Sequence, residues 1–232
     1  ILLHGIFGFL LMVFIALFMF YTGQWGGGDS KIIMAIGALI GLELRVNSVL
    51  ISFLANLVII GAVYGIVWSF ALAMLNKKKF KNRFKALSRK KYFVIFRRVA
   101  LVFSILILIT TFFVETSVKL PVVMLALIIF STAYLLIFIK AVEDSCMYKS
   151  VDVAKLTEGD WVAENIVIDG NYICGPKDLG LTLKQIRKLK NLKAKGKLSK
   201  IVIKQGVPFV PSFLVAFVAT ITLGNLLVGL IS

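Results

Sequence analysis

Charged residues are scarce in this chain, since only 16% of its 232 residues are Asp, Glu, Lys or Arg. A soluble domain has about 25% charged and about 45–50% apolar residues, whereas 59% of this chain is hydrophobic. The mean hydropathy is +0.96. A soluble protein of this length cannot bury so many apolar side chains, so the composition excludes the soluble enzyme classes and indicates an integral membrane protein.

The chain also has little cysteine, proline and acid: two Cys, four Pro and eleven Asp or Glu. Cys146 and Cys174 form no CxxC pair, so we expect no zinc cluster, no other metal and no cofactor. Few prolines and 12% aromatic residues exclude a disordered or collagen-like chain. The net charge is +16. Its basic residues stand between apolar runs, which favours contact with anionic headgroups of membrane lipids and predicts no nucleic-acid partner.

Six apolar segments follow one another along the chain, at residues 1–21, 30–42, 46–75, 93–114, 120–139 and 209–231. The segment 30–42 has 13 residues and covers only about 20 Å, less than the roughly 30 Å of a hydrocarbon core. Both a short spanning helix and a re-entrant helix fit this segment. The other five are long enough to span, so we expect an all-α polytopic membrane protein.

The basic residues predict which side of the membrane each loop occupies. Of the 27 Lys and Arg, 11 lie within 77–98 and 13 within 140–204. Loops rich in Lys and Arg stay on the cytoplasmic side. Two predicted spans separate these regions, so both lie on one side, as the rule requires. We therefore expect a multi-pass protein of the plasma membrane with cytoplasmic basic loops.

A polar stretch before the last apolar segment predicts a small cytosolic α+β unit at 141–206. Residues 162–168 are expected to form a strand, followed by a tight turn at Asp169-Gly170 and a short strand at 172–174. Thr182 and Gln185 form a capping box that opens a helix, which Gly196 ends, and 201–203 is a further strand. The predicted organisation is a membrane core at 1–140, this unit at 141–206 and a final transmembrane helix at 207–232.

Asp29 is the only acidic residue among the first 42. A carboxylate beside apolar spans costs a few kcal/mol on insertion scales, so it is a candidate functional residue; the alternative is a helix cap. Gly26, Gly27 and Gly28 precede it and complete a GxGD motif. Glycines let another backbone approach closely, as an extended peptide substrate requires. We expect Trp25, just before them, to anchor the chain at the membrane interface.

The stretch GGGDSKIIMAIGALIG at 26–41 resembles the active-site motif of type IV prepilin peptidases, whose archaeal branch includes the preflagellin (archaellin) peptidases. In this family of GxGD membrane aspartic proteases a Lys often follows two positions after the aspartate, here Lys31, and then a helix of small residues. Pro208 to Ser212 is similar to the start of the family's last helix. The region 141–206 looks like the C-terminal region of archaeal members. The bacterial methyltransferase zinc loop is absent.

The resemblance implies a two-aspartate hydrolase that cleaves the leader peptide of pilin-like or archaellin precursors at the cytoplasmic face. Asp29 would be one catalytic aspartate, with Gly26, Gly27, Gly28 and Lys31 binding the substrate. One carboxylate activates water while the other, protonated, polarises the scissile carbonyl. The family's second aspartate lies upstream of this motif, and 1–28 holds no acidic residue. We expect it upstream of Ile1; the alternative is an inactive protein.

Two other functions stay open at this stage. A presenilin-like intramembrane protease needs a Pro-Ala-Leu motif and a Tyr-Asp pair, which the sequence lacks. A non-catalytic membrane scaffold or transporter would use Asp29 as a helix cap or a cation site. A second aspartate upstream in the sequence would distinguish the peptidase from this third class.

Overall fold

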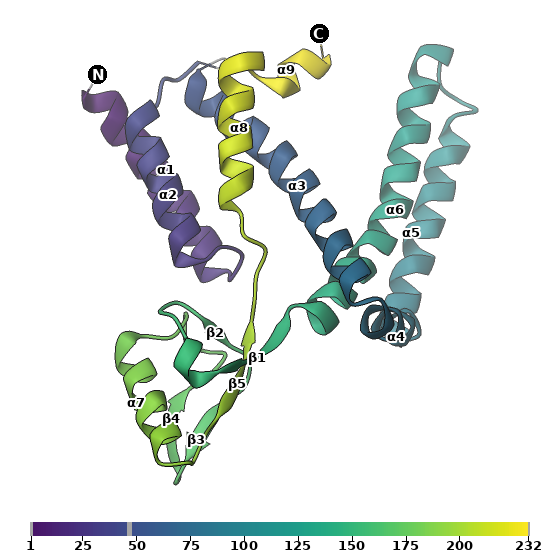
Figure 1. Cartoon of the computed structure of the whole chain (residues 1–232). Coiled ribbons are helices and arrows are strands. Elements are labelled where there is room, and N and C mark those ends of the chain that lie inside the picture. The colour runs from purple at the N-terminus through teal and green to yellow at the C-terminus, as the bar shows by residue number, and fades with distance from the viewer. Residues whose placement is uncertain (1, 46–47, 232) are drawn as a thin grey trace. The chain divides into compact units, whose positions relative to one another are not determined.

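The computed structural model describes residues 2–45 and 48–231 (Figure 1). Residues 1 and 46–47, where two predicted apolar segments begin, and residue 232 lie outside the described residues. Four described helices are long and apolar enough to cross a membrane. They are α1 (Leu2–Tyr21), α3 (Val49–Leu75), α5 (Lys91–Thr110) and α6 (Thr116–Cys146). The predicted fold class, a helical multi-pass membrane protein with a small strand-containing region, is confirmed.

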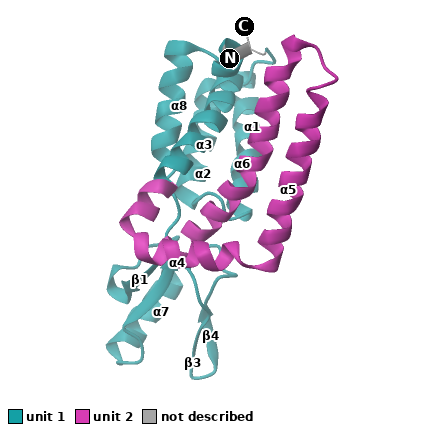
Figure 2. Cartoon of the chain, turned by 90° about the vertical axis from the view of Figure 1, so that its right-hand side faces the viewer, with its two compact units in different colours: residues 1–68, 149–232 teal, residues 69–148 magenta. Residues whose placement is uncertain are grey.

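The chain divides into two compact units (Figure 2): Ile1–Trp68 with Lys149–Ser232, and Ser69–Tyr148. In the second unit, α5 and α6 form a helical hairpin. The Ser104 hydroxyl of α5 donates a hydrogen bond to the Ala126 carbonyl of α6 at 3.0 Å. Small polar residues commonly join helices in this way in lipid. The basic region 77–98 begins with helix α4 (Lys77–Ser88), which buries Leu87 against Ile137 and Ala141 of α6.

In the first unit, α1 packs against the short helix α2 (Gly27–Ile40). Glycines bring these two helices together. A Cβ on Gly8 would lie 2.3 Å from the Gly37 carbonyl oxygen, and one on Gly37 would lie 2.5 Å from the Gly8 carbonyl oxygen. The small-residue helix that the sequence predicted after Asp29 is therefore used for close packing, at Gly37 and at Gly41, which lies against His4. Met12, Ile33, Phe53 and Phe213 are among the residues of the core that results.

The last apolar segment differs from the single helix expected at 209–231. It forms α8 (Val210–Leu223) and the short helix α9 (Leu226–Ile231), separated by Gly224 and Asn225. Gly224 has a φ of 73°, a left-handed value that ends a helix and favours glycine. The break is stabilised by Asn56 of α3, whose side-chain amide donates to the Gly224 carbonyl at 2.8 Å and whose carbonyl accepts from the Leu226 N–H at 2.9 Å.

The region between α6 and α8 is the predicted α+β unit in outline. One sheet has the strand order β1-β5-β2, the other is the hairpin β3-β4. The strands are β1 (Tyr148–Asp152), β2 (Trp161–Val162), β3 (Ile166–Ile168), β4 (Asn171–Cys174) and β5 (Lys200–Lys204), with a 3-10 turn at Val153–Lys155 and helix α7 (Leu183–Ala194). Helix α7 buries Ile186 and Leu189 in the core of this region.

One predicted strand of the α+β unit is wrong and one strand was missed, whereas the predicted strands at 172–174 and 201–203 are confirmed as β4 and β5. The strand expected at 162–168 is divided into β2 and β3, which belong to different sheets, and β1 was not predicted. The turn is confirmed, because Asp169 and Gly170 have φ values of 52° and 75°, as a type I′ hairpin turn requires. The capping box is confirmed as well: the Gln185 N–H donates to the Thr182 hydroxyl, and the Gln185 carbonyl oxygen accepts from the Thr182 N–H at 2.9 Å.

Candidate active site

Asp29 lies in the first turn of α2, three residues after the N-cap Gly26. The Gly26 N–H donates a hydrogen bond to Asp29 Oδ2 at 3.3 Å. The carboxylate also lies at the positive end of the helix dipole, where negative charge is stabilised. Helix α2 therefore begins at Gly27, three residues before the apolar run predicted at 30–42, because the Gly26 N–H finds its acceptor in this side chain.

Backbone groups of Phe209 and Val210, at the start of α8, also act on the Asp29 carboxylate and lower its pKa. One half-buried carboxylate thus joins the N-termini of two helices that are far apart in the sequence. Asp29 lies outside the four spanning helices. Burial raises the pKa of its carboxyl above the usual value, and the hydrogen bonds from Gly26, Val210 and Phe209 offset part of that effect.

Two of the glycines before Asp29, Gly27 and Gly28, have open space around them. Gly27 and Gly28 are exposed. A Cβ built on Gly28 would meet no atom within 4 Å, and one on Gly27 would meet only Phe20, at 3.9 Å. Neither glycine has a left-handed backbone, so the fold itself does not require glycine at these two positions. Their lack of side chains instead keeps the backbone beside Asp29 accessible to another chain.

Lys31, the other predicted substrate-binding side chain, does not join Asp29. Lys31 is exposed, and residues two apart on an α-helix point about 200° apart around its axis. The structure therefore places the Lys31 side chain on a different side of α2 from the Asp29 carboxylate. The predicted site is assembled only in part, as Asp29 with the glycines.

The sequence predicts that Trp25 anchors the chain at the membrane interface. The structure instead places Trp25 in the core. Only 7% of its surface is exposed. Its indole packs edge-to-face on Phe213, with ring centroids 5.2 Å apart, and lies 6.4 Å from the Phe209 ring. Aromatic pairs in this geometry are favourable beyond the area that they bury. Trp25 therefore attaches the loop before Asp29 to the start of α8, and this fixes which backbone groups face the carboxylate.

No second carboxylate acts on Asp29 among the residues that the structure describes. The groups that shift its pKa are its own burial and three backbone groups. Asp144 pairs with Arg83 at 2.5 Å, and Asp152 and Asp169 pair with Lys193 and Lys197. Within residues 2–45 and 48–231, no three His, Cys, Asp or Glu residues gather in a way that would hold a metal ion.

Sequence reasoning singled out Pro208 to Ser212 but did not connect Phe209 and Val210 with Asp29. The available signal was Pro211 at the first turn of α8, a position that proline favours because it has no N–H to leave unpaired. No known protein family, characterised protein or solved structure matches this chain.

Proposed function

We propose that this protein is a membrane aspartic endopeptidase of the GxGD type, which removes the leader peptide of type IV pilin-like or archaellin precursors at the cytoplasmic face of the plasma membrane. The observation that carries the proposal is the half-buried Asp29 carboxylate beside an open glycine backbone. A protease that binds an extended peptide needs both features, a titrating carboxyl group and an unobstructed main chain next to it.

In the proposed reaction, an ionised carboxylate takes a proton from water as the water attacks the scissile carbonyl, and a protonated carboxyl group donates a hydrogen bond to the carbonyl oxygen. Collapse of the tetrahedral intermediate breaks the C–N bond, and the carboxyl group that took the proton from water gives it to the leaving amine. The backbone donors around Asp29 favour its ionised form and burial favours its neutral form. Such a balance suits a carboxyl group that alternates between the two during turnover. Among the described residues only Asp29 fills one of these two roles. The proposal therefore requires a second carboxyl group beside it.

The test is cleavage of a pilin-like or archaellin precursor by the full-length protein in lipid vesicles. Asp29→Asn keeps the shape of the side chain and removes its titrating group, so we expect a loss of cleavage of about 10³-fold or more, in the range seen when a residue of a catalytic pair is removed. The matched control is Asp169→Asn, at an exposed hairpin turn where Asn-Gly is favoured. Full cleavage by the Asp29→Asn protein would overturn the proposal.

A second candidate is a non-catalytic membrane protein in which Asp29 only caps helices. The specific observation in its favour is that the Gly26 N–H donates to this carboxylate and that backbone groups of Phe209 and Val210 also stabilise its charge. In that case Asp29→Ala, which removes the acceptor, lowers stability by about 1 kcal/mol, the usual effect of losing a cap. Asp29→Asn lowers it less, because its amide oxygen still accepts, and no precursor of the host is cleaved by the wild type or by either variant. The peptidase instead predicts cleavage by the wild type and its loss in a variant that remains folded.

A further inference from the structure

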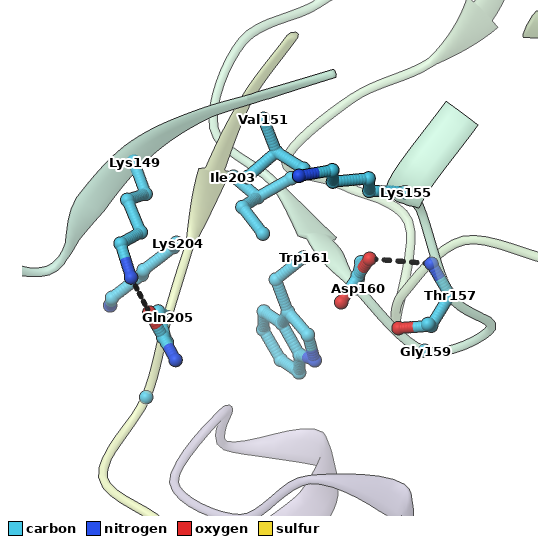
Figure 3. A pocket seen from close by; sticks show the side chains of 11 residues that line it. Lys149, Val151, Lys155, Thr157, Gly159, Asp160, Trp161, Ile203, Lys204 and Gln205 are labelled. Atoms are coloured by element: carbon cyan, nitrogen blue, oxygen red, sulfur yellow. Dashed lines mark hydrogen bonds between the residues drawn. The ribbon is translucent and has the colours of Figure 1, made fainter. Parts of the chain in front are cut away.

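A basic pocket lies in the α+β region, on the three-stranded sheet (Figure 3). Its volume is about 370 Å³. Trp161 occupies the middle of the view, with Lys149 and Lys204 on one side and Lys155 on the other. The strands explain this gathering, because Trp161 of β2 pairs with Lys204 of β5.

The pocket is positively charged. Three lysines line it, and Asp160 is the one acidic side chain among the lining residues. The Asp160 carboxylate accepts the Thr157 N–H at 2.8 Å, which holds it against its own turn. Lys149 donates to Gln205 at 3.2 Å, and the Lys155 side chain is exposed. The cationic lining with a central indole suits an anionic group such as a phosphate or phosphodiester.

The pocket also lies close to the ends of apolar helices. The ring of Trp161 lies against Gly23, since a Cβ on Gly23 would be 3.2 Å from two of its ring atoms, and Gly23 is two residues beyond the end of α1. Gly206, which also lines the pocket, precedes α8 by four positions. At no more than about 3.6 Å per residue, the lining lies within reach of the headgroup layer of a membrane.

We propose that this pocket binds the phosphate group of one anionic lipid headgroup. Tryptophan is enriched at the level of the headgroups, and lysines near a membrane surface attract anionic lipids. Bound lipid would hold the α+β region at the surface of the membrane. This proposal is independent of the chemistry of Asp29, because no pocket residue belongs to the candidate active site.

The test is a titration of the purified, delipidated full-length protein with phosphatidylglycerol or phosphatidylcholine, counting bound lipids by native mass spectrometry. We expect one phosphatidylglycerol site that binds about tenfold more tightly than phosphatidylcholine. Lys155→Glu should weaken this site about tenfold or more, since it replaces attraction by repulsion. Lys155→Gln should weaken it less, and it serves as the milder variant if the charge reversal disturbs folding.

The matched control is Lys188→Glu. Lys188 is an exposed lysine of α7 outside the pocket, and its reversal changes the net charge of the protein by the same amount. Phosphatidylglycerol binding should be unchanged in this variant. If Lys188→Glu and Lys155→Glu weakened phosphatidylglycerol binding equally, the effect would come from the overall charge of the protein, and the proposal would be overturned. Equal binding of phosphatidylglycerol and phosphatidylcholine would also overturn it.

A separate arm distinguishes a lipid from a soluble phosphate compound. Inorganic phosphate or glycerol phosphate is added to the protein with phosphatidylglycerol bound. We expect no displacement at equimolar concentration, because the acyl chains of the lipid remain in the micelle beside the apolar helices. Complete displacement at that concentration would mean that the ligand is a free phosphate compound, and it would overturn the assignment to lipid.

Discussion

The Asn56 side chain of α3 donates a hydrogen bond to the Thr220 hydroxyl of α8 at 3.0 Å, across 164 residues of sequence. The same amide group also donates to the Gly224 carbonyl. Asn56 is completely buried and Thr220 is 7% exposed. A buried amide among apolar helices is costly unless its donors and acceptor are paired. The Asn56 side chain pairs all of its own polar groups, and it also pairs the Gly224 carbonyl and the Leu226 N–H, which the helix break leaves without helical partners. Asn56 therefore stabilises the break between α8 and α9.

Thr220→Val tests this relationship, because valine keeps the shape of threonine and removes the acceptor. One amide proton of Asn56 then lacks its partner, and we expect a loss of about 1 kcal/mol of stability, the usual size of such a bond between membrane helices. The measurement is the free energy of unfolding in detergent. The control is Thr222→Val, since Thr222 is exposed and donates only within α8, to Val218. Equal effects of the two substitutions would contradict the prediction.

The contact of α1 with α2 predicts a specific sensitivity to small increases in volume. A Cβ at Gly37 would lie 2.4 Å from Met12 Cγ and 2.5 Å from the Gly8 carbonyl oxygen, so Gly37→Ala forces the helices apart. We expect a cost of about 1–3 kcal/mol. Gly61→Ala in α3 is the control, because its Cβ would meet nothing within 4 Å and alanine favours a helix. Thermal unfolding of both variants in detergent compares them. A Gly37→Ala protein as stable as wild type would show that the two helices approach less closely.

The features that the sequence predicted correctly are local ones. The turn at Asp169-Gly170 and the capping box of Thr182 and Gln185 depend on residues no more than three positions apart. Long apolar runs also predict membrane helices directly, because the bilayer sets their length. Strand β1 was missed because its pairing partner β5 comes about fifty residues later, and no local pattern in YKSVD indicates a strand.

In the candidate site, too, the sequence predicted the contiguous residues and missed the distant ones. Asp29 and its glycines are contiguous, so the motif showed them together. The backbone donors of Phe209 and Val210 lie about 180 residues further along the chain, and a main-chain N–H has no signature in a sequence. The burial of Trp25 against Phe213 was missed for the same reason, since a tryptophan beside a loop fits both the membrane interface and a core.

Asp152 predicts a pH dependence for the α+β region. A hydrogen bond from Lys193 lowers the pKa of this carboxyl below its usual range, helped by the Ala154 N–H. A lowered pKa in the folded state gives stability that is present above the unfolded value, about 3.9, and is lost as the pH falls through the folded value. The difference in stability between wild type and Asp152→Asn should therefore shrink below about pH 4.

Hydrogen exchange of the β1 and α7 amides across this pH range measures that difference in the full-length protein. Asparagine still accepts the Ala154 N–H, so the variant isolates the charge. Asp169→Asn is the comparison, because this exposed carboxylate also pairs with a lysine, Lys197. If the difference in stability between wild type and Asp152→Asn stayed constant down to pH 2, the ion pair of Asp152 with Lys193 would not be its cause.

Cys174 is predicted to be unreactive in the folded protein. Burial, and then the charge of Asp178, raises the pKa of its thiol to about 11, and its surface is completely buried. Because the thiolate is the nucleophile, only about one thiol in a thousand is reactive at pH 8. In a Cys146→Ser protein, iodoacetamide should leave Cys174 unlabelled at pH 8 over hours and label it within minutes in denaturant, where its pKa returns to about 8.5. Rapid labelling of the folded protein would mean that the β4 core around Cys174 opens, and it would contradict the packing of Ile186 and Leu189 beside it.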